Sequence, residues 1–155
     1  MKTIDDILNY LTEKHPSVMI VRPATDKDIQ MCNEDFIEWG MNLKLPDEYV
    51  NFLKQLNGFA WNGIELYSTD RVTDTETGYM LNDIVSANED FHDNYDEYER
   101  FKKYLCFGRV DDDMYIYNTT KENKRWEVLD IVGLNVMEEY DSFEEFFVAV
   151  VGGYI

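Results

Sequence analysis

The sequence predicts one α+β domain of 155 residues, with a central antiparallel sheet packed with helices. Hydrophobic residues make up 45% of the chain and aromatic residues 15%, which is enough for one core and too much for a disordered chain. Segments with helical spacing lie at both ends, and short apolar runs separated by turn residues lie between them. This order favours an antiparallel sheet.

Two helices are expected before residue 41. The first begins after Thr3, at an N-cap position, and ends at His15, whose ring is expected to complement the helix dipole. The second begins at Thr25 with a pattern that resembles a capping box, and Gly40 ends it. Its apolar stripe is expected to include Trp39. A short strand is expected between the two helices, over residues 18–21.

A third helix is expected after Leu45. Pro46 suits the first helical position, where the missing N–H costs nothing. Asn57-Gly58 suits a left-handed C-cap. The buried stripe of this helix is expected to be Tyr49, Phe52, Leu53 and Leu56.

The sheet is expected to begin with a hairpin around Asn62-Gly63, because both turn residues need a positive φ. Residues 68–78 are polar and are expected to form a loop, and residues 82–103 a helix with a break near Asp93-Asn94. Three further strands are expected over residues 105–110, 114–118 and 126–131. Ser142 begins a capping box that predicts a C-terminal helix ending near Gly152.

Acidic side chains dominate the charge: 32 Asp and Glu stand against 14 Lys and Arg, which gives a net charge of -18. A chain with this charge repels phosphate backbones and anionic lipid surfaces, so neither a nucleic acid nor a membrane is the expected partner. A basic protein is instead attracted. Solubility alone is the alternative explanation of the charge.

The cysteines and the termini favour a cytoplasmic protein. Cys32 and Cys106 form no disulfide framework and are expected to pack as small hydrophobes. The N-terminus shows no signal peptide, and the apolar run over residues 146–151 is too short to span a bilayer. The sequon at Asn118 is interpreted as a chance match. Nothing in the sequence defines an oligomeric state.

The usual signatures of catalysis and cofactor binding are missing, so no enzyme, cofactor or metal is expected. Glu89 and His92 share one helical face, but a di-iron site needs two such motifs, and a solvated face is the alternative. Asp111-Asp112-Asp113 lacks the spacing of a calcium loop and is expected to be a charged turn. A hydrolase that uses a pair of carboxylates stays open as an alternative, because 32 acids bring some pairs together by chance.

The densest acidic segment spans residues 89–99 and contains two tyrosines, which suit a protein interface. The alternative is an exposed helix whose tyrosines face inward. The candidate protein-binding residues are Glu89, Asp93, Tyr95, Asp96, Glu97 and Tyr98, together with Asp111, Asp112 and Asp113. Trp61 and Trp126 are expected to lie in the core.

Several segments resemble a known family when taken in order. Residues 45–53, closed by Asn57-Gly58, resemble the first motif of the SUKH superfamily, which comprises Smi/Knr-type cell-wall regulators and bacterial immunity proteins. Asn62-Gly63 resembles the YrhA-like branch, and residues 105–109 and 139–146 resemble the central strands and the closing helix. The motif residues expected to shape the fold are Leu45, Pro46, Tyr49, Phe52, Leu53, Asn57, Gly58, Asn62, Gly63, Tyr67 and Gly108.

The resemblance implies one SUKH-like domain over residues 1–155, in which residues 1–44 supply N-terminal helices and residues 45–155 match the family. It also implies a protein that binds other proteins and brings no catalytic residues. Bacterial members resemble immunity proteins that neutralise toxins, often nucleases. Fungal relatives regulate cell-wall glucan synthesis, which makes a regulatory scaffold the alternative function. The long acidic insert over residues 69–100 departs from the commonest pattern of the family.

Overall fold

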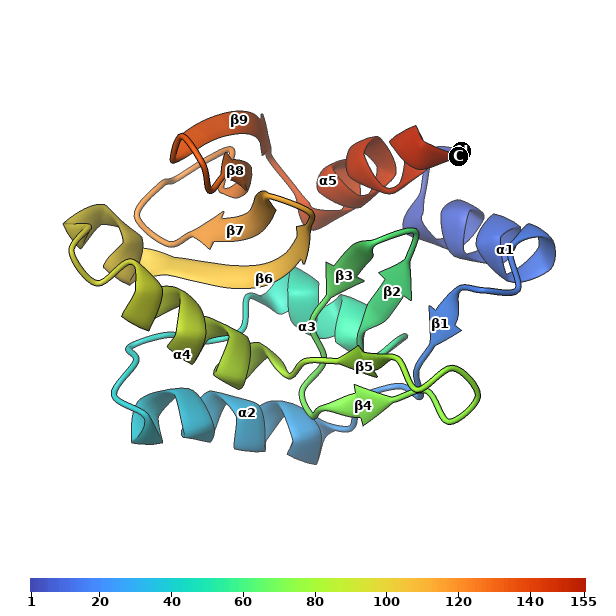
Figure 1. The fold of residues 1–155 in the computed structure, drawn as a ribbon, viewed down its shortest axis with the longest axis horizontal. Coiled ribbons are helices and arrows are strands. Elements are labelled where there is room, and N and C mark those ends of the chain that lie inside the picture. Colours follow the sequence, from blue (N-terminus) through green and yellow to red (C-terminus); the bar gives the residue numbers. More distant parts are fainter.

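The computed structural model describes residues 1–155, apart from the side chain of Ile20. The described residues form a seven-stranded antiparallel sheet in the order β1-β2-β3-β6-β7-β8-β9, and β4 and β5 form a separate two-stranded ribbon (Figure 1). The helices are α1 (Ile4–Lys14), α2 (Asp26–Glu38), α3 (Asp47–Leu53), α4 (Ile84–Asn94) and α5 (Phe143–Val150), with the 3-10 turns η1 (Glu99–Lys103) and η2 (Gly152–Tyr154). The predicted α+β class is confirmed.

The strands alternate with turns along the second half of the chain. The central sheet contains β1 (Met19–Ile20), β2 (Phe59–Trp61), β3 (Ile64–Leu66), β6 (Tyr104–Val110), β7 (Asp113–Asn118), β8 (Trp126–Asp130) and β9 (Asn135–Tyr140). The ribbon contains β4 (Val72–Thr73) and β5 (Met80–Leu81). The hairpin predicted around Asn62-Gly63 is confirmed, with φ angles of 52° and 80° at its two turn residues. The loop predicted for residues 68–78 is wrong at β4, which is too short to leave a periodic pattern.

Both N-terminal helices begin as predicted. The hydroxyls of Thr3 and Thr25 accept from the backbone N–H of Asp6 and Asp28, whose carboxylates bond back to the capping residues. The pKa of Asp6 lies below its ordinary value chiefly because its carboxylate accepts from the backbone N–H of Lys2, with a further contribution from Thr3. The pKa of Asp28 is lowered by the backbone N–H of Thr25 and by the guanidinium of Arg22. Trp39 was expected in the buried stripe of α2, and this is wrong: its side chain is 61% exposed. The helix ends at Glu38, and Gly40 (φ +80°) turns the chain away.

The third helix differs from the prediction at both ends. Pro46 is the N-cap residue and not the first helical residue, and α3 ends at Leu53, before the expected cap at Asn57-Gly58. Gly58 does have a left-handed backbone (φ +109°), but the constraint on it comes from the packing of β5. A Cβ at Gly58 would lie 2.7 Å from Cδ2 of Leu81.

Strand β9 is an element that the sequence pattern did not reveal. Residues 135–139 are exposed on both faces of the sheet, so no apolar alternation marks them. The three strands predicted before it are confirmed as β6, β7 and β8. The break expected in the helix over residues 82–103 is confirmed, because α4 ends at Asn94 and η1 begins at Glu99.

Helices cover both faces of the sheet. On one face, Phe107, Tyr115 and Trp126 pack edge-on or tilted against Phe143 and Phe146 of α5. On the other face, α4 lies against β6, and α2 lies against α4 (Figure 1). Trp126 is 1% exposed and Trp61 is 8% exposed, so both are core residues as expected.

Candidate protein-binding surface

Two side chains of α4 form hydrogen bonds to the sheet, the buried Asn88 and the half-buried His92. The Asn88 amide donates to the carbonyl of Cys106 over 2.8 Å, and the N–H of Cys106 donates to Oδ1 of Asn88 over 2.8 Å. Nε2 of His92 lies 2.9 Å from the carbonyl of Tyr104, which can only accept, so this nitrogen carries the proton. Burial lowers the pKa of His92 despite that bond. These two contacts fix which face of α4 points outward.

The outward face is the acidic one. Asp90, Asp93, Asp96 and Glu97 are exposed, and Glu89 is half-buried. The two tyrosines of this segment lie partly inward: the ring of Tyr95 is 5.2 Å from that of Phe91, and the ring of Tyr98 is 5.3 Å from that of Phe101. Tyr98 still exposes 36% of its surface. The segment therefore combines exposed carboxylates with tyrosine rings that the core holds in place.

The second acidic segment divides between the β6–β7 turn and the first residue of β7. Asp111 and Asp112 are exposed in the β6–β7 turn, and the carbonyl of Asp112 accepts from the N–H of Ile131 over 3.0 Å. Asp113 is half-buried and lines a cavity with Tyr115 and Glu138 on the face that α5 covers. Asp112 is therefore joined to Ile131, which lines the groove beside α4, whereas Asp113 lines the cavity on the α5 face.

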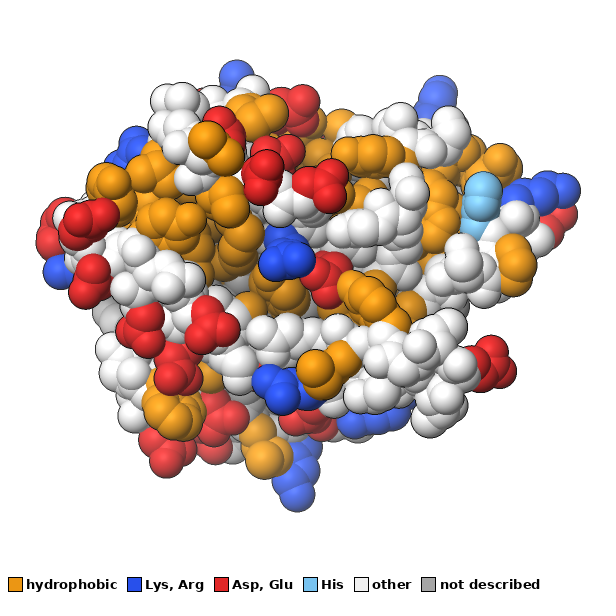
Figure 2. Space-filling model, viewed as in Figure 1, with side chains coloured by type: hydrophobic (Ala, Val, Ile, Leu, Met, Phe, Trp, Pro, Cys, Tyr) orange, Lys and Arg blue, Asp and Glu red, His pale blue; other side chains and the backbone are white. Residues whose placement is uncertain are grey.

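A groove of about 280 Å³ lies beside the contact between α4 and the sheet. Its walls include Asp90 and Asn94 of α4, and Arg109, Met114 and Ile131 of the sheet. Figure 2 shows hydrophobic side chains gathered where the β7–β9 region approaches α4, with acidic side chains around them. We call this region the α4 surface and define it as Asp90, Asp93, Asn94, Tyr95, Asp96, Glu97, Tyr98, Arg109, Met114 and Ile131.

The turn after α4 is joined to the β8–β9 connection by one arginine. Nη2 of Arg100 donates to the carbonyl of Leu134 over 2.6 Å, and its guanidinium lies 4.8 Å above the ring of Phe101. Leu134 has a φ of 57°, which is uncommon for a bulky residue. A larger cavity of about 850 Å³ lies beside this turn, and its lining mixes Asp96 and Glu99 with Lys102 and Lys103.

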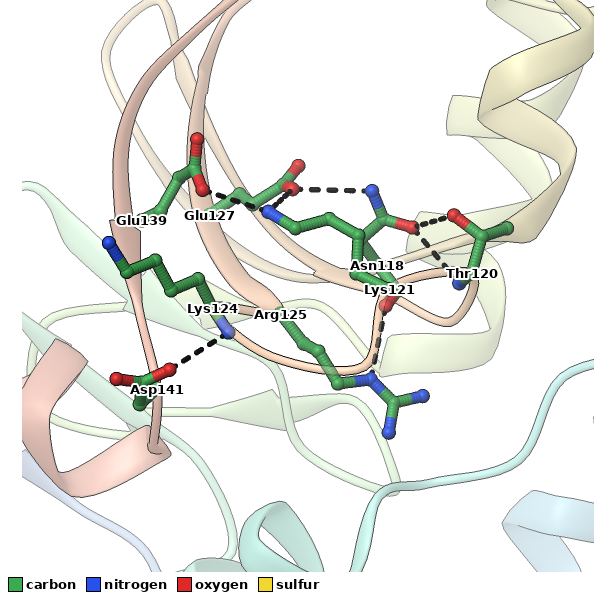
Figure 3. A network of polar contacts seen from close by, with 8 residues as sticks. All are labelled: Asn118, Thr120, Lys121, Lys124, Arg125, Glu127, Glu139 and Asp141. Atoms are coloured by element: carbon green, nitrogen blue, oxygen red, sulfur yellow. Dashed lines mark hydrogen bonds and ion pairs between the residues drawn. The ribbon is translucent and has the colours of Figure 1, made fainter.

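A polar network supports the far end of the sheet (Figure 3). Glu127 is 1% exposed, and its Oε2 accepts from Nζ of Lys121 over 2.8 Å and from the amide of Asn118 over 3.2 Å. Nζ of Lys121 also donates to Glu139 of β9 over 3.0 Å. The network therefore ties β9 to the β7–β8 connection. Oε1 of Glu127 has no hydrogen-bond partner among the described residues.

Most family-motif residues act on the fold, although Tyr67 also lines the groove beside α4. The Tyr49 hydroxyl donates to the carbonyls of Tyr67 and Phe107, which joins α3 to β6 and to the residue after β3. Asn57 exchanges two hydrogen bonds of 2.9 Å with Thr69, which fixes the start of the acidic insert. A Cβ at Gly108 would overlap the carbonyl oxygen of Glu65. The remaining motif residues Leu45, Phe52 and Leu53 are buried.

The side chains that could hold a metal do not converge. Among the residues that the structure describes, no group of three or more His, Cys, Asp and Glu side chains could hold a metal ion. Burial raises the pKa of both Cys32 and Cys106 to about 12, so neither is a reactive thiolate at neutral pH. In the described part of the chain no helix is both long enough and apolar enough to cross a membrane.

The fold and the motif contacts define the class of protein: an α+β domain whose antiparallel sheet is anchored by the helix that follows Leu45. Residues 23–149, more than half of the chain, match the model of the SMI1 / KNR4 family (SUKH-1), and the chain belongs to this family. The resemblance to the SUKH superfamily is thereby confirmed, and its YrhA-like branch stays a prediction. Domains of this family are generally not enzymes and bind protein partners. No curated protein matches the sequence.

The sequence did not reveal the residues that build the site. Asn88 and Arg100 act through hydrogen bonds to Cys106 and Leu134, which lie 18 and 34 positions away, and Glu127 acts through a bond to Lys121, 6 positions away. A buried Asn on the apolar side of α4 was the one visible signal, because an amide there needs a partner.

Proposed function

We propose that this protein is an immunity-type binding domain that neutralises a basic toxin domain, and that the α4 surface is the contact. The observation that carries the proposal is a groove of mixed lining, with Met114 and Ile131 beside Asp90 and Arg109, next to the exposed carboxylates of residues 90–97. Protein interfaces combine apolar contacts with polar ones, and the α4 surface offers both kinds of side chain.

Charge supports a basic partner and opposes a nucleic acid. The net charge of -18 attracts a cationic surface over distances near a Debye length and speeds the encounter. A nuclease has such a surface, because it must bind phosphates. Carboxylates such as Asp93 of α4 and Asp96, which follows the helix, would occupy the places of those phosphates. The proposal includes a cytoplasmic location, because a nuclease reaches its nucleic acid there.

Family membership also supports a second candidate, a regulatory scaffold in cell-wall or glucan synthesis. That function needs a stable partner among envelope enzymes and no toxin gene beside this one. The gene next to this one therefore separates the two candidates, since a large secreted protein with a nuclease-like end fits the first alone.

The test of the first candidate is binding to the toxin domain encoded beside this gene. The variant Asp93→Lys/Asp96→Lys places cations on the α4 surface, and we expect it to weaken binding about 100-fold, since like charges across an interface cost several kcal/mol. The matched control is Glu13→Lys/Glu34→Lys, which makes the same change of net charge on exposed positions of α1 and α2.

The control variant should bind within about threefold of the wild type, and 500 mM NaCl should weaken the wild-type complex. Equal losses in both variants would mean that net charge acts without a defined surface. Unchanged binding in both would mean that the partner contacts another face. Co-purification of envelope enzymes in place of a toxin would support the scaffold.

A further inference from the structure

Strand β9 presents an open edge of the central sheet. It pairs with β8 on one side, and among the described residues its backbone forms no hydrogen bond to any other segment. Five of its six residues are exposed, from Asn135 to Glu139. An edge of this length can accept a further strand, because its outward N–H and C=O groups are unpaired.

Two cavities lie between β9 and α5, and Ala149 lines both of them. The first holds about 200 Å³ and is lined by Asp113, Tyr115, Glu138 and Tyr154 among others. The second holds about 400 Å³, and its lining includes Tyr140, Glu144, Glu145 and Lys2. Figure 1 shows β9 and α5 as neighbours joined by a short connection. A strand added to β9 would place alternate side chains over these cavities.

The first cavity contains a buried polar group without a partner. Tyr115 is 0% exposed, and its hydroxyl makes no hydrogen bond among the described residues. Burial raises the pKa of this hydroxyl, and Tyr154, Asp113 and Glu138 add to the effect, so the groups nearest to it line the same cavity. A protonated tyrosine hydroxyl can accept a hydrogen bond from an ammonium or guanidinium group.

The carboxylates of the first cavity also lack a cation. Burial and the charges of Asp130, Asp112, Asp111 and Glu138 raise the pKa of Asp113. Glu138 accepts a hydrogen bond from the Tyr140 hydroxyl, and no ion pair of Asp113 or Glu138 is formed within the described part of the chain. A basic side chain in this cavity would supply the missing charge and the missing donor at once.

We propose that the groove between β9 and α5 binds an extended basic segment of a partner protein, which adds to β9 as a strand and places a lysine or arginine between Asp113, Glu138 and the Tyr115 hydroxyl. A second copy of this chain fits less well, because antiparallel pairing of two β9 strands brings Glu138 and Glu139 of both copies together. The groove lies on the α5 side of the sheet, so the inference does not depend on the α4 surface or on a toxin.

The test uses a fluorescein-labelled peptide of alternating Lys and Val. Its two controls are the same peptide with Glu in place of Lys, and a Lys-Val peptide methylated at alternate backbone amides. We expect saturable binding of the first peptide, with amide shift changes in residues 135–150. We expect the Glu peptide not to bind, and backbone methylation to weaken binding at least tenfold, because it removes the donors that a strand needs.

Variants of the protein locate the site. Glu138→Lys should lower the affinity for the Lys-Val peptide at least tenfold, and Tyr115→Phe should lower it severalfold. Tyr115→Phe removes a hydroxyl that has no partner, so its melting temperature should not fall. Glu76→Lys, an equal charge change at an exposed position before β5, should leave the affinity unchanged. Asp93→Lys/Asp96→Lys should also leave it unchanged, which separates this site from the α4 surface.

The proposal is overturned if the Lys-Val peptide does not bind, if the Glu peptide binds as well, or if methylation has no effect. Shift changes confined to α4, or equal loss in Glu138→Lys and Glu76→Lys, would also overturn it. Sedimentation that shows a dimer abolished by Glu138→Lys would assign the edge to a second copy of the chain instead.

Discussion

Asp113 carries a carboxylate whose surroundings oppose its ionisation. Burial raises its pKa above the ordinary 3.8, and the neighbouring charges of Asp130 and Asp112 add to the effect. The folded state therefore binds this proton more tightly than the unfolded state, and the contribution of Asp113 to stability falls as the pH rises above about 3.8. At neutral pH the ionised group destabilises the fold.

We expect Asp113→Asn to be more stable than the wild type at pH 7, because the amide carries no charge. The difference should shrink as the pH falls and vanish below about 3.8, where Asp113 is protonated in both states. Thermal denaturation at pH 7 and pH 3.5, at low protein concentration, measures it. A difference of the same size at both pH values would show that the charge is not the cause.

Gly108 allows β3 and β6 to approach each other. A Cβ at this position would overlap the carbonyl oxygen of Glu65 and lie 2.9 Å from Cδ2 of Leu66. We expect Gly108→Ala to lower the free energy of unfolding by about 3 kcal/mol, the upper end for an overpacked core. Gly153→Ala is the matched control, since nothing lies within 4 Å of its added Cβ. Urea denaturation that gave equal losses in both variants would contradict this explanation.

The role of a residue could be predicted from the sequence where it depends on contacts with near neighbours in the chain. Thr3 and Thr25 cap helices through atoms three positions away, and Asn62-Gly63 forms a turn within itself. Gly58 was correctly picked out but for a different reason, because the close contact with Leu81 comes from a segment 23 positions away and no local pattern encodes it. Tyr115 was expected in a strand, yet its orphan hydroxyl follows only from the packing of α5 over the sheet.

At the scale of elements, the Asn88 amide joins α4 to β6. Asn88 satisfies both the N–H and the C=O of Cys106 in the core. We expect Asn88→Ala to cost about 3 kcal/mol in free energy of unfolding, because it leaves two buried backbone groups unpaired. Hydrogen exchange in α4 should accelerate more than in β7 and β8.

The control for this variant is Asn94→Ala, at an exposed position near the end of the same helix. It should change the free energy of unfolding by no more than about 0.5 kcal/mol. If the two variants lose equal stability in urea denaturation, helix propensity and not the attachment to β6 explains the loss.

Elements could be predicted where one of their faces is buried. Strands β6, β7 and β8 carry apolar residues because helices cover them, and α5 shows its stripe because it packs on the sheet. Strand β9 is held by its backbone pairing with β8 and by the bond from Lys121 to Glu139, neither of which leaves an apolar period. The site proposed on its edge was for this reason invisible in the sequence.

At the scale of the whole molecule, the sequence defines the total charge, and the topology decides which face carries it. Asp112 and Asp113 are adjacent in the chain, yet one is exposed in the turn and the other enters the cavity under α5. Asp112 ends the turn and Asp113 begins β7, so the division depends on where the turn ends and the strand begins. The acidic residues Asp90, Asp93, Asp96 and Glu97 are by contrast all exposed, on α4 and in the segment that follows it.

An excess of 32 acidic over 14 basic side chains should also affect stability. Exposed carboxylates repel one another across the folded surface, and salt screens this repulsion over a Debye length. We expect the melting temperature to rise by about 3 °C between 20 mM and 500 mM NaCl, which corresponds to about 1 kcal/mol for a chain of this size. The variant Asp93→Asn/Asp96→Asn/Glu97→Gln should show a smaller rise, because it removes three of the repelling charges on one segment. If the melting temperature instead falls with salt, attractive pairs such as Lys121 with Glu127 outweigh the repulsion. The carboxylates would then destabilise the folded state less than the net charge indicates.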